Sequence, residues 1–234
     1  MLIAFNNDPK LKAGLVREIN KHRVQDRLVN GTYGKLSQGQ AFKGCAVGCS
    51  IRSYCLLTKE SLETGNHSNY EKFGIPQLLA RLEDGIFEGL SRQDSKEWPV
   101  LFMSSIPVGA DLPGVWPKFV QWLLVDPVHG VIRYAKTDAQ KKAIQRVADL
   151  YAMSSKATKD EFREAARACR NAYAADAAAD AADAAYAAYA ADAAADAAYA
   201  AYAAYAADAR QKARRFQAEK LLELLRAAPV KKAA

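Results

Sequence analysis

The chain has 234 residues, half of them hydrophobic, and a formal net charge of +7 at pH 7. No run of about 18 uncharged apolar residues occurs, and the apolar start Met1–Phe5 is followed at once by polar residues, so the sequence predicts neither a membrane span nor a signal peptide. The four cysteines are then expected to be reduced thiols of a cytoplasmic protein.

Helix signals begin near the N-terminus. Asp8 followed by Pro9 is typical of a helix start, and apolar residues at helical spacing extend the predicted helix to about Asn30. Residues 31–44 are rich in glycine and small polar residues and predict a loop. A second, short helix is expected to begin inside the cysteine-bearing segment 44–49.

Two further helices follow a polar, turn-rich stretch. Pro76 opens an amphipathic helix that is expected to end near Gly89. The pair Trp98 and Pro99 is interpreted as the start of a shorter helix that continues to Ile106.

Three more elements complete the first part of the chain. Residues 115–123 predict a strongly apolar helix, and residues 131–134 predict a short strand or an extended connection. Thr137 caps a last amphipathic helix that runs to Tyr151. The sequence therefore predicts an all-α fold, with a helical globular domain over residues 1–152.

The second part of the chain is predicted to be one long helix. After a linker at 153–158, Thr158 and Glu161 have the spacing of a capping box. No glycine or proline follows until Pro229, and alanine has the highest helix propensity, so residues 159–227 are expected to be helical throughout. A basic tail, 228–234, ends the chain.

Tyrosine and aspartate interrupt the alanine-rich tract at steps of mostly three residues, which wind around a helix and form no fixed stripe. One interpretation is solvated filler from repeat expansion; the other is close helix–helix packing on the small alanines. Beyond the tract come apolar side chains that need a covering surface, either the globular domain, a hairpin or a second chain. They are Phe216, Leu221, Leu222, Leu224 and Leu225.

Cys45 and Cys49 are the first candidates for chemistry, because a spacing of four places both thiols on one face of a helix. A zinc site would need two more ligands, and Cys55, His67 and His22 are the nearby candidates. No second cysteine or histidine pair with metal-ligand spacing occurs, so no metal ion and no cofactor are expected.

A thiol nucleophile is the alternative chemistry. Cys45 or Cys49 at a helix start would have a pKa lowered by the helix dipole. His67, or else His22, would act as the base, and Glu71 would orient it.

The plain alternative is that both cysteines are small buried hydrophobes that pack a tight turn. In the helix that starts after Pro76, the acidic residues Glu83, Asp84 and Glu88 are interpreted as its solvated face.

Basic residues near the C-terminus give a weak indication of nucleic-acid binding, weak because Phe216 is the only aromatic residue among them. Positive charge also favours the C-terminal end of a helix, which explains the same pattern without a ligand. The residues are Arg210, Lys212, Arg214, Arg215, Lys220, Lys231 and Lys232.

Several blocks together carry a family resemblance. The chain resembles a family of bacterial and phage proteins in three segments. They are Gly44-Cys45-Ala46-Val47-Gly48-Cys49, Phe73-Gly74-Ile75-Pro76 and residues 79–90. Members of that family also tend to end in an alanine-rich repeat of variable length and a short leucine-rich helix. The resemblance implies a bacterial or phage setting and brings no established activity with it.

The sequence therefore favours a non-enzymatic interaction or assembly protein, with the alanine-rich helix as a spacer or oligomerisation element. A protein partner or self-association is expected. A cysteine-dependent enzyme that uses Cys45 or Cys49 with His67, and a weak nucleic-acid binder that uses the basic tail, stay open as alternatives.

Overall fold

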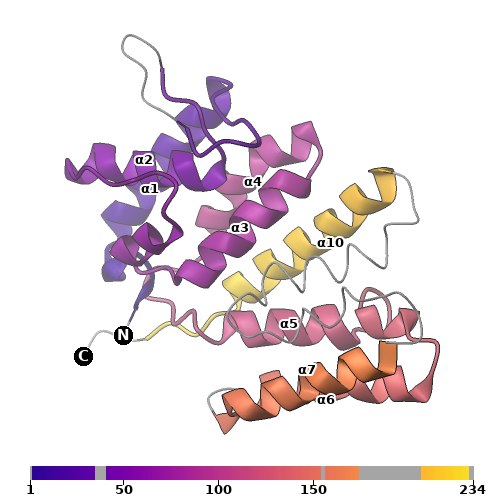
Figure 1. Ribbon diagram of the computed structural model, residues 1–234. Helices are drawn as coiled ribbons and strands as arrows, with labels where there is room; N and C mark the ends of the chain where they lie inside the picture. Colours follow the sequence, from indigo (N-terminus) through magenta and orange to yellow (C-terminus); the bar gives the residue numbers. More distant parts are fainter. Residues whose placement is uncertain (1, 35–40, 154–155, 174–206, 232–234) are drawn as a thin grey trace. The chain divides into compact units, whose positions relative to one another are not determined.

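The computed structural model describes residues 2–34, 41–153, 156–173 and 207–231, and the fold is all-α (Figure 1). Over this part of the chain the β-pairing is limited to two isolated bridges, Leu28 with Gly44 and Ala110 with Val230. No helix in it is long and apolar enough to cross a membrane. The chain divides into two compact units, Met1–Pro113 with Ala218–Ala234, and Gly114–Gln217. The domain boundary that the sequence predicts at residue 152 stays a prediction.

The first unit is built on four helices, α1 (Pro9–Val24), α2 (Ala46–Thr58), α3 (Gln77–Gly89) and α4 (Arg92–Ser105). Helix α1 packs against α2 and α4, and α3 packs against the same two helices. Two 3₁₀ helices, η1 (Ala4–Asn7) and η2 (His67–Phe73), lie in the same unit. Its core contains the largest fully buried side chains, which include Trp98, Tyr70, Phe5, Phe73, Phe87 and Phe102.

Helix α1 begins as the sequence predicts and ends earlier. The Asp8 side chain accepts a hydrogen bond from the backbone N–H of Lys10 at 2.7 Å. The predicted continuation to Asn30 is wrong, because Asp26 adopts a left-handed conformation (φ 52°) that stops the helix. Leu28 then pairs with Gly44 instead of continuing the apolar face of α1.

Helix α4 begins at Arg92, not at Trp98 and Pro99. Ser91 caps it by accepting a hydrogen bond from the backbone N–H of Asp94 at 3.1 Å. Pro99 therefore lies inside the helix, at the cost of one backbone hydrogen bond.

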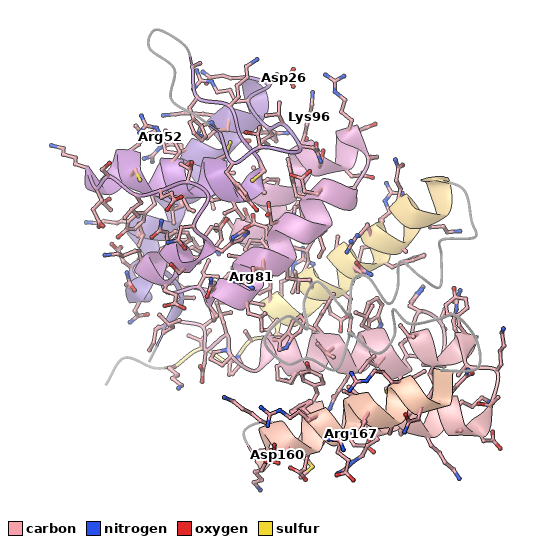
Figure 2. All side chains as sticks on the ribbon, viewed as in Figure 1. Asp26, Arg52, Arg81, Lys96, Asp160 and Arg167 are labelled. Carbon is pink, nitrogen blue, oxygen red and sulfur yellow. The ribbon has the colours of Figure 1, made fainter. Side chains whose placement is uncertain are left out.

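Helix α4 also contacts the residues that follow α1. Lys96 of α4 forms an ion pair with Asp26 at 2.6 Å, and both residues are labelled in Figure 2.

The second unit contains α5 (Val115–Val125), η3 (Val131–Tyr134), α6 (Asp138–Ala152) and α7 (Lys159–Tyr173). Helix α6 packs against α5 and α7, with the rings of Trp116, Tyr151 and Phe162 in edge contact. The predicted cap at Thr137 is confirmed as a full capping box with Gln140. Residues 131–134 form a 3₁₀ helix, so the predicted strand or extended connection is wrong.

The predicted long helix is described at its two ends. Helix α7 covers Lys159–Tyr173, and Thr158 exchanges hydrogen bonds with Glu161 in the predicted capping arrangement. Helix α10 covers Ala207–Arg226. The centre of the alanine-rich tract, 174–206, lies outside the described residues.

The leucine-rich end of α10 belongs to the first unit and is buried. Leu221 and Leu225 are fully buried and Leu222 nearly so, whereas Leu224 is half-buried. Beyond the helix, the backbone N–H of Asp111 donates to Pro229 O at 2.8 Å, and the N–H of Lys231 donates to Gly109 O at 3.1 Å. The leucines are therefore covered within a single chain, and self-association stays a prediction.

Removing the buried leucines tests this arrangement. Leu221→Ala and Leu225→Ala should each lower the free energy of unfolding by about 2–5 kcal/mol, because each leaves a cavity in a packed site. Leu224→Ala is the matched control and should cost less. Urea unfolding gives the energies, and light scattering should show an unchanged mass. A drop in mass with both alanine variants would instead assign these leucines to an interface between copies.

Candidate functional site

The candidate site lies where the start of α2, the 3₁₀ helix η2 and helix α3 of the first unit come together. Cys45 is the N-cap of α2, and its backbone N–H donates to Thr32 O at 2.6 Å. A Cβ on Gly48 would lie 2.2 Å from the Tyr33 carbonyl oxygen, so only glycine lets this backbone pass over the first turn of α2. This crossing brings the Tyr33 side chain to the site.

Asp84 of α3 is the centre of the polar contacts. Its Oδ2 accepts a hydrogen bond from Tyr33 Oη at 3.1 Å and lies 3.1 Å from His67 Nε2. The rings of Tyr33 and His67 also meet edge to face, with centroids 5.5 Å apart. Asp84 Oδ1 is buried and has no hydrogen-bond partner in the part of the chain that the structure describes.

The acidic residues of α3 do not form a solvated face, which corrects the sequence interpretation. Glu83 is fully buried and the Asp84 side chain is only 13% exposed, whereas Glu88 is exposed. The physical reason is that α3 is covered by α2, α4 and η2 together, so burial extends beyond its apolar stripe.

Both candidate nucleophiles are buried thiols. Cys45 Sγ accepts a hydrogen bond from Gly48 N–H at 3.5 Å, and Cys49 Sγ donates to Gly44 O at 3.4 Å. Burial first, and then the neighbouring Asp84 carboxylate, raise the pKa of the Cys45 thiol far above its ordinary value. Burial also raises the pKa of Cys49 to about 12. The expected lowering by the helix start is therefore outweighed.

The histidines are placed differently from the predicted catalytic pair. His67 faces Asp84, and that carboxylate also borders Cys45. A base for Cys45 would have to face the thiol itself. His22 is buried against the Phe42 ring, and burial lowers its pKa to about 4. Glu71, proposed to orient His67, is exposed, and Asp84 contacts the imidazole instead.

Three potential ligand atoms gather at this site. Cys45 Sγ, an Asp84 carboxylate oxygen and a Glu88 carboxylate oxygen all lie within 4.8 Å of one another. The sequence analysis considers Cys55, His22 and His67 as further metal ligands beside the two thiols, and does not identify either carboxylate as one. Their spacing of four residues on one helix was the available signal. Glu88 is fixed by the Gly31 N–H, which lies 3.0 and 2.9 Å from its two oxygens.

Behind the site, Glu83 and Tyr70 form a fully buried pair. Tyr70 Oη donates to Glu83 Oε2 at 2.6 Å, while Glu83 Oε1 has no hydrogen-bond partner among the described residues. Burial raises the pKa of Glu83 well above its ordinary value, against the lowering effect of the Tyr70 hydrogen bond. This carboxyl group is thus driven towards its neutral form.

The remaining predicted interaction residue, Phe216, lies in the second unit. Its ring lies tilted against that of His129, with centroids 4.1 Å apart and an interplanar angle of 33°. Several bases of the predicted nucleic-acid tail have partners within the chain: Arg214 donates to Gln217 at 2.9 Å, Lys220 pairs with Glu223 at 2.7 Å and Lys231 pairs with Asp111 at 2.8 Å.

Comparison of the chain with protein-family models, with curated proteins and with solved structures finds no match. Functional inference therefore depends on the geometry of the described residues alone.

Thiol labelling tests the buried state of the cysteines. In native protein treated with EDTA, Cys45 and Cys49 should react slowly with iodoacetamide at pH 7. With a pKa of about 12, Cys49 has a thiolate fraction about 1000-fold below that of a thiol of pKa 9. The rate should be the same in His67→Ala and should rise strongly in urea. Fast native labelling of Cys45 that depends on His67 would contradict this and support a nucleophile.

Glu83→Gln tests the buried carboxyl group. A carboxyl group with a raised folded-state pKa stabilises the fold fully below its unfolded pKa, and that stability is lost as pH rises towards the folded pKa. Above about pH 4.5, the wild-type protein should therefore lose up to about 1.4 kcal/mol per pH unit relative to the variant. Urea unfolding between pH 4.5 and 8 measures the difference. The exposed Glu97→Gln serves as the control, and equal slopes for both variants would contradict the assignment.

Proposed function

We propose that this is a non-enzymatic interaction or assembly protein, whose first unit receives a segment of a protein partner in a groove between α1 and α4. The observation that carries this proposal is the chemistry of the groove, which has a volume of about 670 Å³. It is lined by Pro9, Lys12, Ala13, Val16, Arg17 and Asn20 of α1, by Val100 and Ser104 of α4, and by Val108.

The groove combines an apolar floor with positive charge. Val16 and Val100 supply apolar surface from the two helices, and Leu101, next in α4, is 43% exposed. Lys12 and Arg17 are the charged lining residues, and no carboxylate is among the lining residues. Glu18, next to Arg17 in α1, forms an ion pair with it at 3.6 Å, so Lys12 is the lining cation without a carboxylate partner among the described residues. Lys12 Nζ donates to Ser104 O and Ile106 O, which holds its charge at the end of α4. A segment with apolar and acidic side chains fits this surface.

The other two functions have less support from the geometry. A cysteine hydrolase needs a thiolate and a base that faces it, whereas both thiols are buried with raised pKa values and His67 faces Asp84. For a nucleic-acid binder, the described bases of the tail include Lys220 and Lys231, each in an ion pair that a phosphate would have to replace. The spacer role of the alanine-rich tract and the bacterial or phage setting rest on the sequence.

Selection of displayed peptides on the full-length protein tests the groove. Enriched peptides should carry apolar and acidic side chains. Val100→Glu and Arg17→Glu should each weaken binding of the best peptide about 10-fold or more, because the first places a charge on the apolar floor and the second reverses the complementary charge. Lys142→Glu in α6 is the matched charge reversal and should bind normally. The proposal would be rejected if the enriched peptides lacked acidic residues. It would also be rejected if both groove variants bound the best peptide as tightly as the wild-type protein does.

A further inference from the structure

The ligand atoms of Cys45, Asp84 and Glu88 come from rigid parts of the first unit. Asp84 and Glu88 are separated by one helical turn of α3, so their side chains share a face. Cys45 is fixed at the start of α2 by its cap bond from Gly48 and by the backbone bond to Thr32. Helices hold a ligand set more rigidly than loops do.

The separation of the three atoms suits one small cation. Zinc binds sulfur at about 2.3 Å and carboxylate oxygen at about 2.0–2.2 Å, so tetrahedral ligands lie roughly 3.3–3.6 Å apart. Atoms that already lie within 4.8 Å of one another reach that separation through small side-chain rotations. A thiolate beside two carboxylates matches the mixed sulfur and oxygen chemistry that zinc accepts.

A second observation at the same place points to a cation. Asp84 Oδ1 is buried without an N–H or O–H donor among the described residues, although its sister oxygen has both Tyr33 and His67 as neighbours. The Asp84 carboxylate also interacts with the Cys45 thiol, the other inner ligand of the proposed site. A buried acceptor without an N–H or O–H donor carries a desolvation cost. A metal ion on Oδ1 would remove that cost and would also offset the repulsion between the Asp84 and Glu88 carboxylates.

The surrounding hydrogen bonds have the arrangement that orients metal ligands. Tyr33 Oη and His67 Nε2 hold Asp84 from behind through Oδ2, and the Gly31 N–H holds Glu88. Such outer contacts fix ligand rotamers and tune affinity in metal sites. Glu88 is exposed, which leaves an entry path from solvent, while Cys45 is buried at the inner end.

We propose that Cys45, Asp84 and Glu88 bind one zinc ion, with Tyr33 and His67 as positioning residues and the remaining coordination position open to water. On binding, Cys45 releases its thiol proton to solvent and ligates as the thiolate, so that one thiolate and two carboxylates face the dication. This site is separate from the groove between α1 and α4 and does not depend on the proposed function.

Metal titration of the EDTA-treated full-length protein tests the site. Zinc, added in competition with a chromogenic chelator, should bind at one ion per chain. Cobalt(II), used as a spectroscopic substitute, should give the sulfur-to-cobalt charge-transfer absorption that reports thiolate ligation. Cys45→Ser should abolish that absorption. Glu88→Gln, which keeps the size of the side chain and an oxygen that can accept from the Gly31 N–H, should weaken zinc binding by more than about 100-fold, and His67→Ala by about 10–100-fold.

Matched controls separate ligation from folding. Cys55→Ser and Glu97→Gln remove a thiol and an exposed carboxylate elsewhere in the first unit and should bind zinc normally. Circular dichroism of each metal-free variant checks its fold. If Cys45→Ser unfolds, the Glu88→Gln titration still decides the question. A wild-type protein that binds no stoichiometric zinc, or zinc binding that Glu88→Gln leaves unchanged, would overturn the proposal.

Discussion

The close passage of residues 32–33 over the first turn of α2 determines the geometry of the candidate site. Gly48 makes it feasible, because a Cβ there would overlap the Tyr33 carbonyl oxygen at 2.2 Å. Gly44 contributes as well, since its backbone pairs with Arg27 and Val29 on the same connection. Through this passage Cys45 becomes a helix cap and Tyr33 reaches Asp84 of α3. The glycines thus couple three segments that are distant in sequence.

Burial and helix position act in opposite directions on the two thiols, and burial prevails. The N-terminus of a helix carries a partial positive charge, which stabilises a thiolate and lowers the pKa of a thiol placed there. Cys45 is 1% exposed and Cys49 is fully buried, so each loses nearly all of its hydration when ionised. The Asp84 carboxylate adds a second penalty at Cys45. Only a strong local positive charge would reverse this balance, and a metal ion is the usual source of one.

Local signals made most of the fold predictable, and tertiary contacts decided the rest. Asp8, Thr137 and Thr158 were recognised as caps because their hydrogen bonds span three residues or fewer. The end of α1 was missed because Leu28 has the right helical spacing but pairs with Gly44, sixteen positions away. Similarly, Cys45 and His67 could be identified as candidates from the sequence. Their common neighbour Asp84 could not, because its burial depends on how η2 and α2 cover α3.

Adjacent residues of α3 show two ways in which this unit accommodates acidic groups away from water. Glu83 is enclosed completely, with Tyr70 as its hydrogen-bond donor, and the raised pKa favours a neutral carboxyl group. Asp84 is less completely buried. Tyr33 and His67 contact its Oδ2, whereas its Oδ1 has no N–H or O–H donor among the described residues. Glu88, one turn further, reaches solvent and closes the set around Cys45. Burial is therefore graded along α3 from a neutral carboxyl group to an exposed carboxylate. Asp84 is the intermediate residue, and its buried Oδ1, beside the Cys45 thiol, is the oxygen that a cation would stabilise.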